Sequence, residues 1–452
     1  MTQPNAHRSP FTRRSFLSLA AAGGMTATLA ACGSGSSPRD AGGGEPAAAT
    51  GDGGAGGYDG PEVDLKFWNG FTGGDGPTMK ALVDQFNSEH ANIAVTMTTM
   101  QWADYYSKLP TAVTSGNGPD VGIMHVDSVA TNAARNVIQP LDDVATALEL
   151  AEGDFAPVPW QAGIYDGKRF AIPLDVHPLG FYYNKDVMES AGLDPEAPPT
   201  DAASYMDALE SLKSAGVEGH WASPFPFTGG LSLQSLIYQF GGSLFNEDGT
   251  SVTWGEDPAV QALTWWVDLI NEGYSPAKVD QDADYIALKN GKSAFNWNGI
   301  WQINDLKQTD IGWGVAPLPN IGGSAAAWAG SHQFVLPVQK SADENKAQAS
   351  RVFLNWISEQ SQSWAEAGQV PARNSARESE EFTALEEQSA LAAQIDVLRF
   401  PPTVPGIADS MSEFDKALNA ATLGGTDPAT ALADSAGRAQ KILDDNAKKY
   451  GG

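Results

Sequence analysis

Cysteine is almost absent from this sequence: Cys32 is the only one in 452 residues. A chain with one cysteine cannot form an internal disulfide, so packing and hydrogen bonds must hold its core together. Basic residues are also scarce, with 27 Lys and Arg against 55 Asp and Glu and a formal net charge of −28. Such a surface repels nucleic acid and has no general attraction for anionic lipid. Nucleic-acid binding is therefore excluded as a function class.

Long apolar runs and familiar catalytic signatures are missing as well. No apolar run from Val63 onward is long enough to cross a bilayer. The chain has no Gly-x-Ser-x-Gly nucleophile elbow and no His-Glu-x-x-His zinc motif. The one dense acidic cluster, residues 280–284, lacks the glycine and glutamate of a calcium loop, and we interpret it as a solvated turn and helix cap. We therefore expect neither a metal nor a cofactor.

The first residues carry the pattern of an export signal. Arg13 and Arg14 form a twin-arginine pair ahead of an apolar, alanine-rich stretch over residues 19–31. That stretch ends in Leu-Ala-Ala before Cys32 and resembles a bacterial lipobox, in which cleavage leaves a lipidated cysteine as the first residue. The alternative is an inert lone thiol after a chance apolar segment. We predict that residues 1–32 comprise a signal peptide and the lipidated Cys32.

The remainder divides into a linker and a folded body. Residues 33–60 are rich in glycine, serine, alanine and proline, a composition that cannot form a core and behaves as a flexible tether. From Val63, strand and helix patterns alternate, which favours an α/β fold with parallel strands and helices on both faces of the sheet. Strands are predicted over 63–68, 93–100 and 119–125, and helices over 77–88, 103–115, 201–214, 231–239, 257–271 and 345–357.

One stretch, residues 292–301, brings aromatic and amide side chains together. Small and aromatic residues alternate up to Trp297, as in a strand, and the dipeptide Asn298-Gly299 is typical of a turn before a helix. Trp301 would then lie at the carboxyl end of a strand, where ligands bind in open α/β sheets. A flat apolar ring beside an amide suits a sugar, which has apolar ring faces and a hydroxylated rim. Alternatively, both tryptophans belong to the core and Asn298 only forms the turn.

Five further motifs follow one another in a characteristic order. They are Phe-Trp-Asn-Gly-Phe-Thr from Phe67, Pro-Asp-Val from Pro119, Gln-Pro-Leu-Asp from Gln139, Asp-Gly-Lys-Arg-Phe-Ala-Ile-Pro from Asp166 and Gly-Phe-Tyr-Tyr-Asn-Lys from Gly180. With the Asn-Gly-Ile-Trp segment and the lipobox, they make the chain resemble extracellular solute-binding protein family 1, the maltose-binding-protein-like lipoproteins of ABC sugar transporters. The resemblance extends from Val63 to the C-terminus.

The resemblance implies a two-lobed periplasmic-binding-protein type II fold. Each lobe would be a mostly parallel sheet flanked by helices, and segments crossing near Pro173, Ala316 and Arg373 would form a hinge. The ligand would lie in the cleft between the lobes and be buried when they close. The expected divisions are lobe 1 from residues 61–173 with 316–372, and lobe 2 from residues 174–315 with 373–452.

A sugar cleft needs aromatic platforms and polar groups that engage neighbouring hydroxyls. In the family, the positions matching Asp175, Trp301, the loop before His332 and Arg373 often touch the ligand. The candidate ligand-binding residues are Trp68, Asn69, Phe71, His125, Asp127, Asp175, His177, Trp221, Asn298, Trp301, Ser331, His332 and Arg373.

Several of these candidates have an alternative structural role. Trp68 is equally suited to the core, and Trp221 to packing with neighbouring phenylalanines. Arg373 could instead clamp a carboxylate across the hinge, and loop aspartates often only form turns.

The function implied by the resemblance is capture of a carbohydrate and its delivery to the permease subunits of an ABC importer. The protein would be a monomer, held by its lipid on the extracellular face of the cell membrane. The many aromatic residues favour an oligosaccharide, and the few basic ones argue against phosphorylated solutes. The alternative is an exported glycosidase or lyase, whose paired carboxylates could be hidden among 55 acidic residues. A passive adhesive lipoprotein fits the alternating α/β order and aromatic loops less well.

Overall fold

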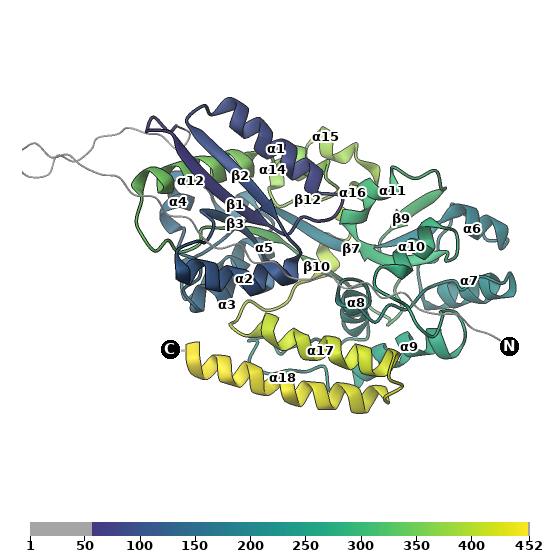
Figure 1. Ribbon diagram of the computed structural model, residues 1–452. Coiled ribbons are helices and arrows are strands. Elements are labelled where there is room, and N and C mark those ends of the chain that lie inside the picture. Colours follow the sequence, from purple (N-terminus) through teal and green to yellow (C-terminus); the bar gives the residue numbers. More distant parts are fainter. Residues whose placement is uncertain (1–56, 451–452) are drawn as a thin grey trace, which may run out of the picture. The chain divides into compact units, whose positions relative to one another are not determined.

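The computed structural model describes residues 57–450, which fold into a mixed α/β structure (Figure 1). The predicted signal peptide, Cys32 and nearly all of the predicted linker lie outside the described residues. None of the helices in the described part combines the length and the apolar character that crossing a membrane would require.

Five strands form the first sheet, in the order β2-β1-β3-β11-β6. β1 pairs in parallel with β2 and β3, as expected, whereas β11 runs antiparallel to both β3 and β6. The bounds are β1 (Val63–Asn69), β2 (Ile93–Thr99), β3 (Val121–His125), β6 (Ile172–Pro173) and β11 (His332–Val335).

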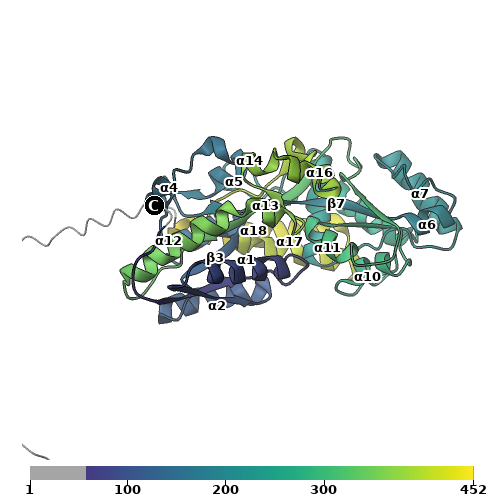
Figure 2. The ribbon, with the colours of Figure 1, turned by 90° about the horizontal axis from the view of Figure 1, so that it is seen from above.

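Helices cover this sheet and complete its core. Pro77 lies in the first turn of α1, as expected for a residue without a backbone N–H, and α12 packs beside α1 and against β1 (Figure 2). The Phe67 and Phe353 rings meet edge to face at 5.3 Å in this core. The helices are α1 (Gly76–Glu89), α2 (Trp102–Ser115), α3 (Val126–Ala134), α4 (Asp142–Ala147), α5 (Pro157–Ala162), α12 (Glu344–Glu359) and α13 (Ser361–Ala365).

The second sheet is organised around β7 (Asp175–Asn184), whose ten residues are all buried. Strands β8, β9, β10 and β12 each pair with β7 in antiparallel fashion, and only β10 with β13 is parallel. The expectation of a mostly parallel sheet is therefore wrong here. The periodicity of a strand carries no information about the direction of its neighbour. The long helical segment after β7 allows the next strand to pair with β7 in either the parallel or the antiparallel direction. The bounds are β8 (Phe295–Gly299), β9 (Trp313–Ala316), β10 (Ala327–Gly330), β12 (Val370–Pro371) and β13 (Leu398–Arg399).

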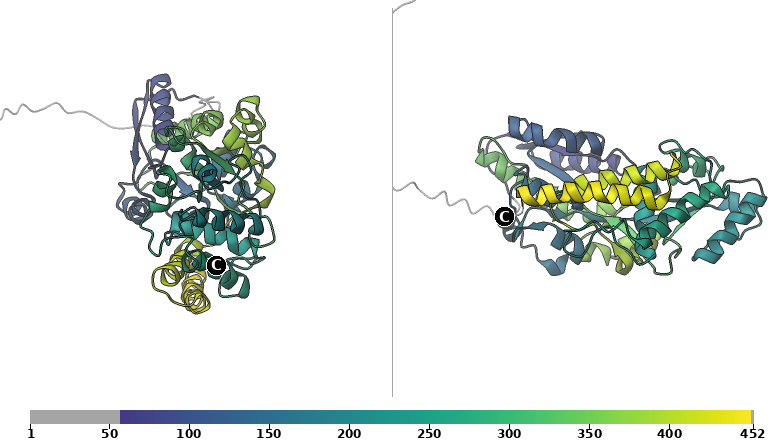
Figure 3. Two further views of the ribbon diagram at one scale, coloured as in Figure 1. Left: turned by 90° about the vertical axis from the view of Figure 1, so that its right-hand side faces the viewer. Right: turned by 90° about the horizontal axis from the view of Figure 1, so that it is seen from below.

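The helices of the second half form where the apolar spacing places them. Helices α8 and α9 have the predicted bounds, and Leu263 and Trp266 of α9 are buried. The Asp201 side chain caps α7 by accepting a hydrogen bond from the Ser204 backbone. Helices α17 and α18 lie side by side (Figure 3). The main helices are α6 (Lys185–Ser190), α7 (Ala202–Ser214), α8 (Leu231–Gln239), α9 (Asp257–Asn271), α10 (Ala283–Lys289), α11 (Ile303–Leu306), α17 (Ile407–Thr422) and α18 (Pro428–Tyr450). Shorter helices are α14 (Asn374–Arg377), α15 (Glu380–Thr383) and α16 (Glu386–Ala392).

The stretch over residues 292–301 differs from its prediction in one respect. Asn298 and Gly299 are not a turn but the last two residues of β8, paired with Gly180 and Leu179 of β7. Their pairing with β7 overrides the local turn preference of the dipeptide. The chain then continues as the 3-10 turn η3 (Ile300–Gln302) and α11.

The chain passes from one sheet to the other within short segments. Leu174 separates β6 from β7, and Ser331 separates β10 from β11. The first change of sheet lies near Pro173, as expected, whereas the second comes later than the expected Ala316, which is part of β9. The lobe limits themselves remain a prediction.

The acidic cluster at residues 280–284 is not fully solvated, contrary to expectation. Asp284 is buried, and its Oδ2 accepts a hydrogen bond from Nδ2 of Asn296 at 2.9 Å. Its Oδ1 has no partner among the described residues. The pKa of Asp284 is raised to about 6, chiefly because burial penalises the charged form.

This carboxyl should make stability depend on pH. Its pKa is higher in the folded state than in the unfolded state, so its favourable contribution is present at low pH and is lost as pH rises through about 6. We expect Asp284→Asn to match the wild type near pH 4 and to be more stable by about 1–3 kcal/mol at pH 8. Urea unfolding of both proteins across this range measures the difference, and a difference independent of pH would contradict the assignment.

Candidate functional site

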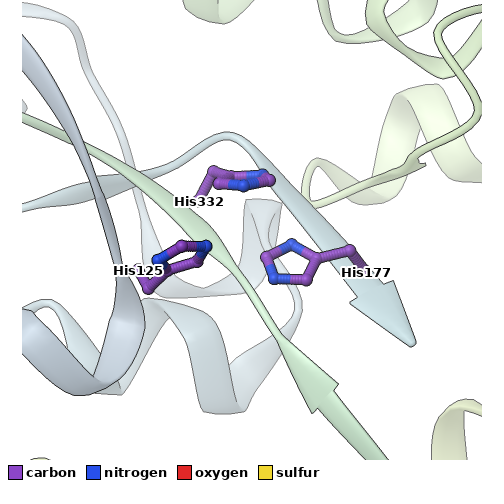
Figure 4. Close-up of side chains that lie close together, drawn as sticks. All are labelled: His125, His177 and His332. Atoms are coloured by element: carbon purple, nitrogen blue, oxygen red, sulfur yellow. The ribbon is translucent and has the colours of Figure 1, made fainter. Parts of the chain in front are cut away.

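Three histidines meet where the two sheets adjoin (Figure 4). His125 ends β3 and His332 begins β11, and the two lie opposite each other in the antiparallel register. His177 comes from β7 and lies opposite Gly330 of β10. One ring nitrogen from each histidine lies within 4.8 Å of the others. Strand pairing thus brings together residues that are far apart in the chain.

One buried carboxylate orients two of these imidazoles. Asp175 Oδ1 accepts from Nδ1 of His177 at 3.0 Å, and its Oδ2 accepts from Nδ1 of His332 at 2.7 Å. The backbone N–H of His332 and Nε1 of Trp364 donate to the same carboxylate at 2.9 and 2.8 Å. Burial alone would raise the pKa of Asp175, but the electrostatic influence of His332 and the imidazole hydrogen bonds outweigh it, so this pKa lies far below its usual range.

The third imidazole is held by a tyrosine. The Tyr106 hydroxyl accepts a hydrogen bond from the His125 backbone N–H at 2.8 Å and lies 2.9 Å from its Nδ1. Burial lowers the pKa of His125 well below its usual value, and the neighbouring His332 and His177 lower it further. Burial, with His332, also lowers the pKa of His177 to about 4. Both rings are therefore uncharged at neutral pH.

Partly exposed tryptophans surround the histidines. The Trp102 ring is stacked on His332 with centroids 5.6 Å apart and lies 4.2 Å from His125. Trp301 and Trp328 flank His177 at 6.0 and 5.7 Å. Gly299 allows this arrangement, because a Cβ there would lie 2.0 Å from the Trp301 ring. Flat apolar faces thus adjoin a polar centre.

The predicted site residues near this cluster are mostly buried. Phe71 packs edge-on against His332 at 4.8 Å. The Asn69 Oδ1 accepts from the Phe71 N–H and from Thr99, and Ser331 Oγ accepts from Gln333 Nε2 at 2.9 Å.

Two further predicted residues are engaged by their own neighbours. Asn298 donates to Asn296 and accepts from the Gly299 N–H. Asp127 lies in the first turn of α3, and burial raises its pKa to about 6.

Three predicted residues make none of the ring contacts with the histidines. Arg373 donates to the Ser358 carbonyl at 3.1 Å and to its hydroxyl at 2.8 Å, with its guanidinium 5.0 Å from the Phe155 ring centroid. Trp68 packs against an apolar cluster that includes Tyr105 and Leu109 of α2. Trp221 is partly exposed, and its Nε1 has no partner among the described residues.

Sequence reasoning missed Trp102, Tyr106 and Trp328. Each lies close to a segment that was singled out: Trp102 and Tyr106 follow the second strand, and Trp328 precedes Ser331 and His332. The available signal was an aromatic residue just beyond or before a strand end. That rule selected Trp68 and Trp301 and applies to Trp102, whereas Tyr106 lies inside α2 and Trp328 inside β10, where the rule gives no signal.

A separate surface cavity of about 460 Å³ lies between α4 and the start of α12. Its lining includes Asp120, Asp143, Lys346 and Arg351, and the last pairs with Asp143. None of the predicted ligand-binding residues lines it. The histidine and tryptophan cluster therefore remains the better candidate for a functional site.

Comparison with known proteins decides the family. Residues 81–390 match the family model of bacterial extracellular solute-binding proteins. The chain belongs to this family. A binding protein of Brucella abortus is 22% identical to this solute-binding protein over 383 residues, 81% of this chain and 90% of the relative. The maltodextrin-binding protein MdxE of Bacillus subtilis is 23% identical over 347 residues, 73% of this chain and 79% of the relative.

Solved structures show the fold. The GacH receptor of Streptomyces glaucescens, studied unliganded and with acarbose, superposes on this solute-binding protein with a TM-score of 0.76 and 23% identity. The match covers 85% of this chain and 99% of GacH. The two-lobed periplasmic-binding-protein architecture and the family expected from the sequence motifs are thus confirmed.

Proposed function

We propose that this solute-binding protein captures a carbohydrate between its lobes and delivers it to an ABC permease. The observation that carries the proposal is the set of partly exposed Trp102, Trp301 and Trp328 rings around a polar centre. Aromatic faces match the apolar faces of a sugar ring, while buried polar groups fix orientation. Closure of the lobes requires that the solute bind the closed state more tightly than the open one.

The relatives support a carbohydrate of more than one ring. The Bacillus subtilis relative is named for maltodextrin, and GacH was solved with acarbose. Three tryptophans around the cluster provide more aromatic surface than one small sugar ring would cover. We therefore propose an oligosaccharide as the solute.

The contacts of the carboxylates support binding without turnover. A glycosidase needs a proton-donating carboxyl and a second carboxylate across the scissile bond. Asp175 accepts four hydrogen bonds and its lowered pKa keeps it ionised, which suits a structural anion and not an acid. Asp127, with its raised pKa, is the only other predicted site carboxyl. We propose that the protein has no hydrolase or lyase activity.

The location follows from the sequence signals. We propose that Cys32 carries a lipid, that residues 33–60 tether the body to the extracellular face of the cell membrane, and that the protein acts as a monomer. Metabolic labelling with a fatty acid tests the anchor: incorporation should be lost in Cys32→Ser.

A binding screen combined with a turnover assay tests the function. We expect one or more oligosaccharides to raise the melting temperature of the purified protein, and calorimetry should confirm 1:1 binding. Monosaccharides and a sugar phosphate serve as comparisons. The same mixtures, analysed by chromatography after long incubation, should contain unchanged saccharide. Cleaved products would support the enzyme alternative, and no stabilisation by any saccharide would contradict the carbohydrate proposal.

A further inference from the structure

We infer that His125, His177 and His332 form a binding site for a divalent transition metal of the zinc class, with a fourth coordination position left open. The inference concerns the metal alone and does not depend on which solute the protein carries. Imidazole is a preferred ligand of such metals, and three protein ligands with one free position are typical of zinc sites that also bind a further molecule.

The ring nitrogens are close to the spacing that a metal requires. One nitrogen of each histidine lies within 4.8 Å of the others. Three nitrogens bound to zinc at 2.0–2.1 Å in a tetrahedral arrangement are about 3.4 Å apart. A bound zinc would therefore draw each ring inward by less than about 1 Å.

The hydrogen bonds select the nitrogen that would bind the metal. A carboxylate can only accept, so Nδ1 of His177 and of His332 must donate to Asp175, which leaves both Nε2 lone pairs free. Tyr106 contacts Nδ1 of His125 and can accept from it in the same way. The nitrogen that these contacts leave available in each ring is therefore Nε2. Imidazoles oriented through Nδ1 by a carboxylate are the usual outer-shell arrangement of histidine–metal sites.

The backbone that presents the three ligands is well suited to a fixed geometry. His125 and His332 are directly opposite each other on β3 and β11, and His177 lies in the fully buried β7. Gly330 leaves room for the third ligand, because a Cβ at this position would lie 2.3 Å from Nε2 of His177. The set spans both sheets, so a bound metal would tie them together at the point where the chain crosses.

The fourth position is available for water or for an oxygen atom of the solute. The described residues bring no further cysteine, aspartate, glutamate or histidine into this ligand group. Asp175 lies beside it but is occupied by four donors, so it orients ligands and does not replace one. Trp301 and Trp328, next to His177, place the proposed solute platforms beside the metal.

Metal titration of the purified chain, stripped of metal with a chelator, tests the inference. We expect one Zn²⁺ per chain by calorimetry with micromolar or tighter affinity, and a higher melting temperature in its presence. Co²⁺ should give the intense visible bands of a four-coordinate ion. A stripped wild-type chain that binds neither ion at micromolar concentrations would overturn the inference, whatever the variants do.

Asparagine substitutions separate metal binding from folding. The side-chain amide of His177→Asn can still donate to Asp175 in place of Nδ1 but has no atom at the Nε2 position. We expect His177→Asn and His332→Asn to weaken Zn²⁺ binding on the order of 100-fold or more while keeping the metal-free melting temperature near that of the wild type. His90, at the C-terminal end of α1 and apart from the other histidines, provides the matched control. The His90→Asn variant should bind Zn²⁺ with the affinity of the wild type. Equal Zn²⁺ affinity in wild type and His177→Asn would overturn the assignment.

Asp175→Asn tests the orienting role. The amide oxygen can still accept from one imidazole, but the amide NH₂ cannot accept from the other, so Zn²⁺ affinity should fall about 10–100-fold with one ion still bound per chain. A change in stoichiometry to zero with no loss in the histidine variants would show that Asp175 itself is the ligand and overturn the three-histidine site.

Discussion

Asp175→Ala is expected to lower the free energy of unfolding by about 3–5 kcal/mol. The carboxylate is fully buried and accepts from the side chains of His177, His332 and Trp364, and from one backbone N–H. Alanine leaves these buried donors without a protein acceptor, and each unpaired buried group costs about 1–3 kcal/mol. Urea denaturation followed by tryptophan fluorescence and circular dichroism measures the change.

The control for Asp175→Ala is a surface carboxylate. Asp84 pairs with Lys80 on the exposed face of α1, and both side chains are more than half exposed. We expect Asp84→Ala to change the free energy of unfolding by less than about 0.5 kcal/mol. A loss from Asp175→Ala no greater than that of the control would mean that water enters the histidine cluster and satisfies its donors.

Trp301→Ala is expected to weaken the affinity for the best oligosaccharide about 10–100-fold, in the range of an aromatic hot spot. The ring is partly exposed, lies over Gly299 and is 6.0 Å from His177, so it offers one face to a solute. Removing it takes away the stacking surface and leaves the hydrogen-bonding groups in place. Isothermal titration calorimetry measures the loss, and Trp301→Phe should recover part of it.

A tryptophan remote from the site provides the matched control for Trp301→Ala. Trp356 lies on α12, packs against Phe86 and donates from Nε1 to Glu89. Trp356→Ala should leave solute affinity within about twofold of the wild type, because it touches neither the histidines nor their tryptophans. Unchanged affinity in Trp301→Ala would remove the stacking role, and an equal loss in both variants would indicate a general effect on folding.

Local patterns account for much of the secondary structure. Apolar spacing predicted α8 and α9 to the residue, and Pro77 marked the start of α1. These features depend on periodicity and on backbone chemistry within a few residues, which the sequence shows directly. Strand direction in the second sheet was predicted wrongly, because direction depends on how distant segments return to β7 and leaves no local trace.

The candidate site was likewise predicted only as far as local patterns reach. His125, His177 and His332 were each selected singly as residues at strand ends, and Trp301 by its motif. The contacts of His177 and His332 with Asp175 were not predicted, nor was the meeting of the three histidines, nor the contributions of Trp102 and Trp328. For the same reason the sequence indicated no metal site: the histidines have no short spacing, and only the register of β3 with β11 and the burial of β7 bring them together.

The sequence by itself determined the family, the order of most strands and helices, and which residues carry polar or aromatic chemistry at strand ends. All of these are encoded in short motifs and in side-chain periodicity. Only the tertiary structure decided that three histidines meet, two of them on one buried carboxylate and the third on a tyrosine, with three tryptophans around them. That arrangement depends on pairing between strands far apart in the chain, and one residue of register shift would turn each of these side chains to the opposite face of its sheet.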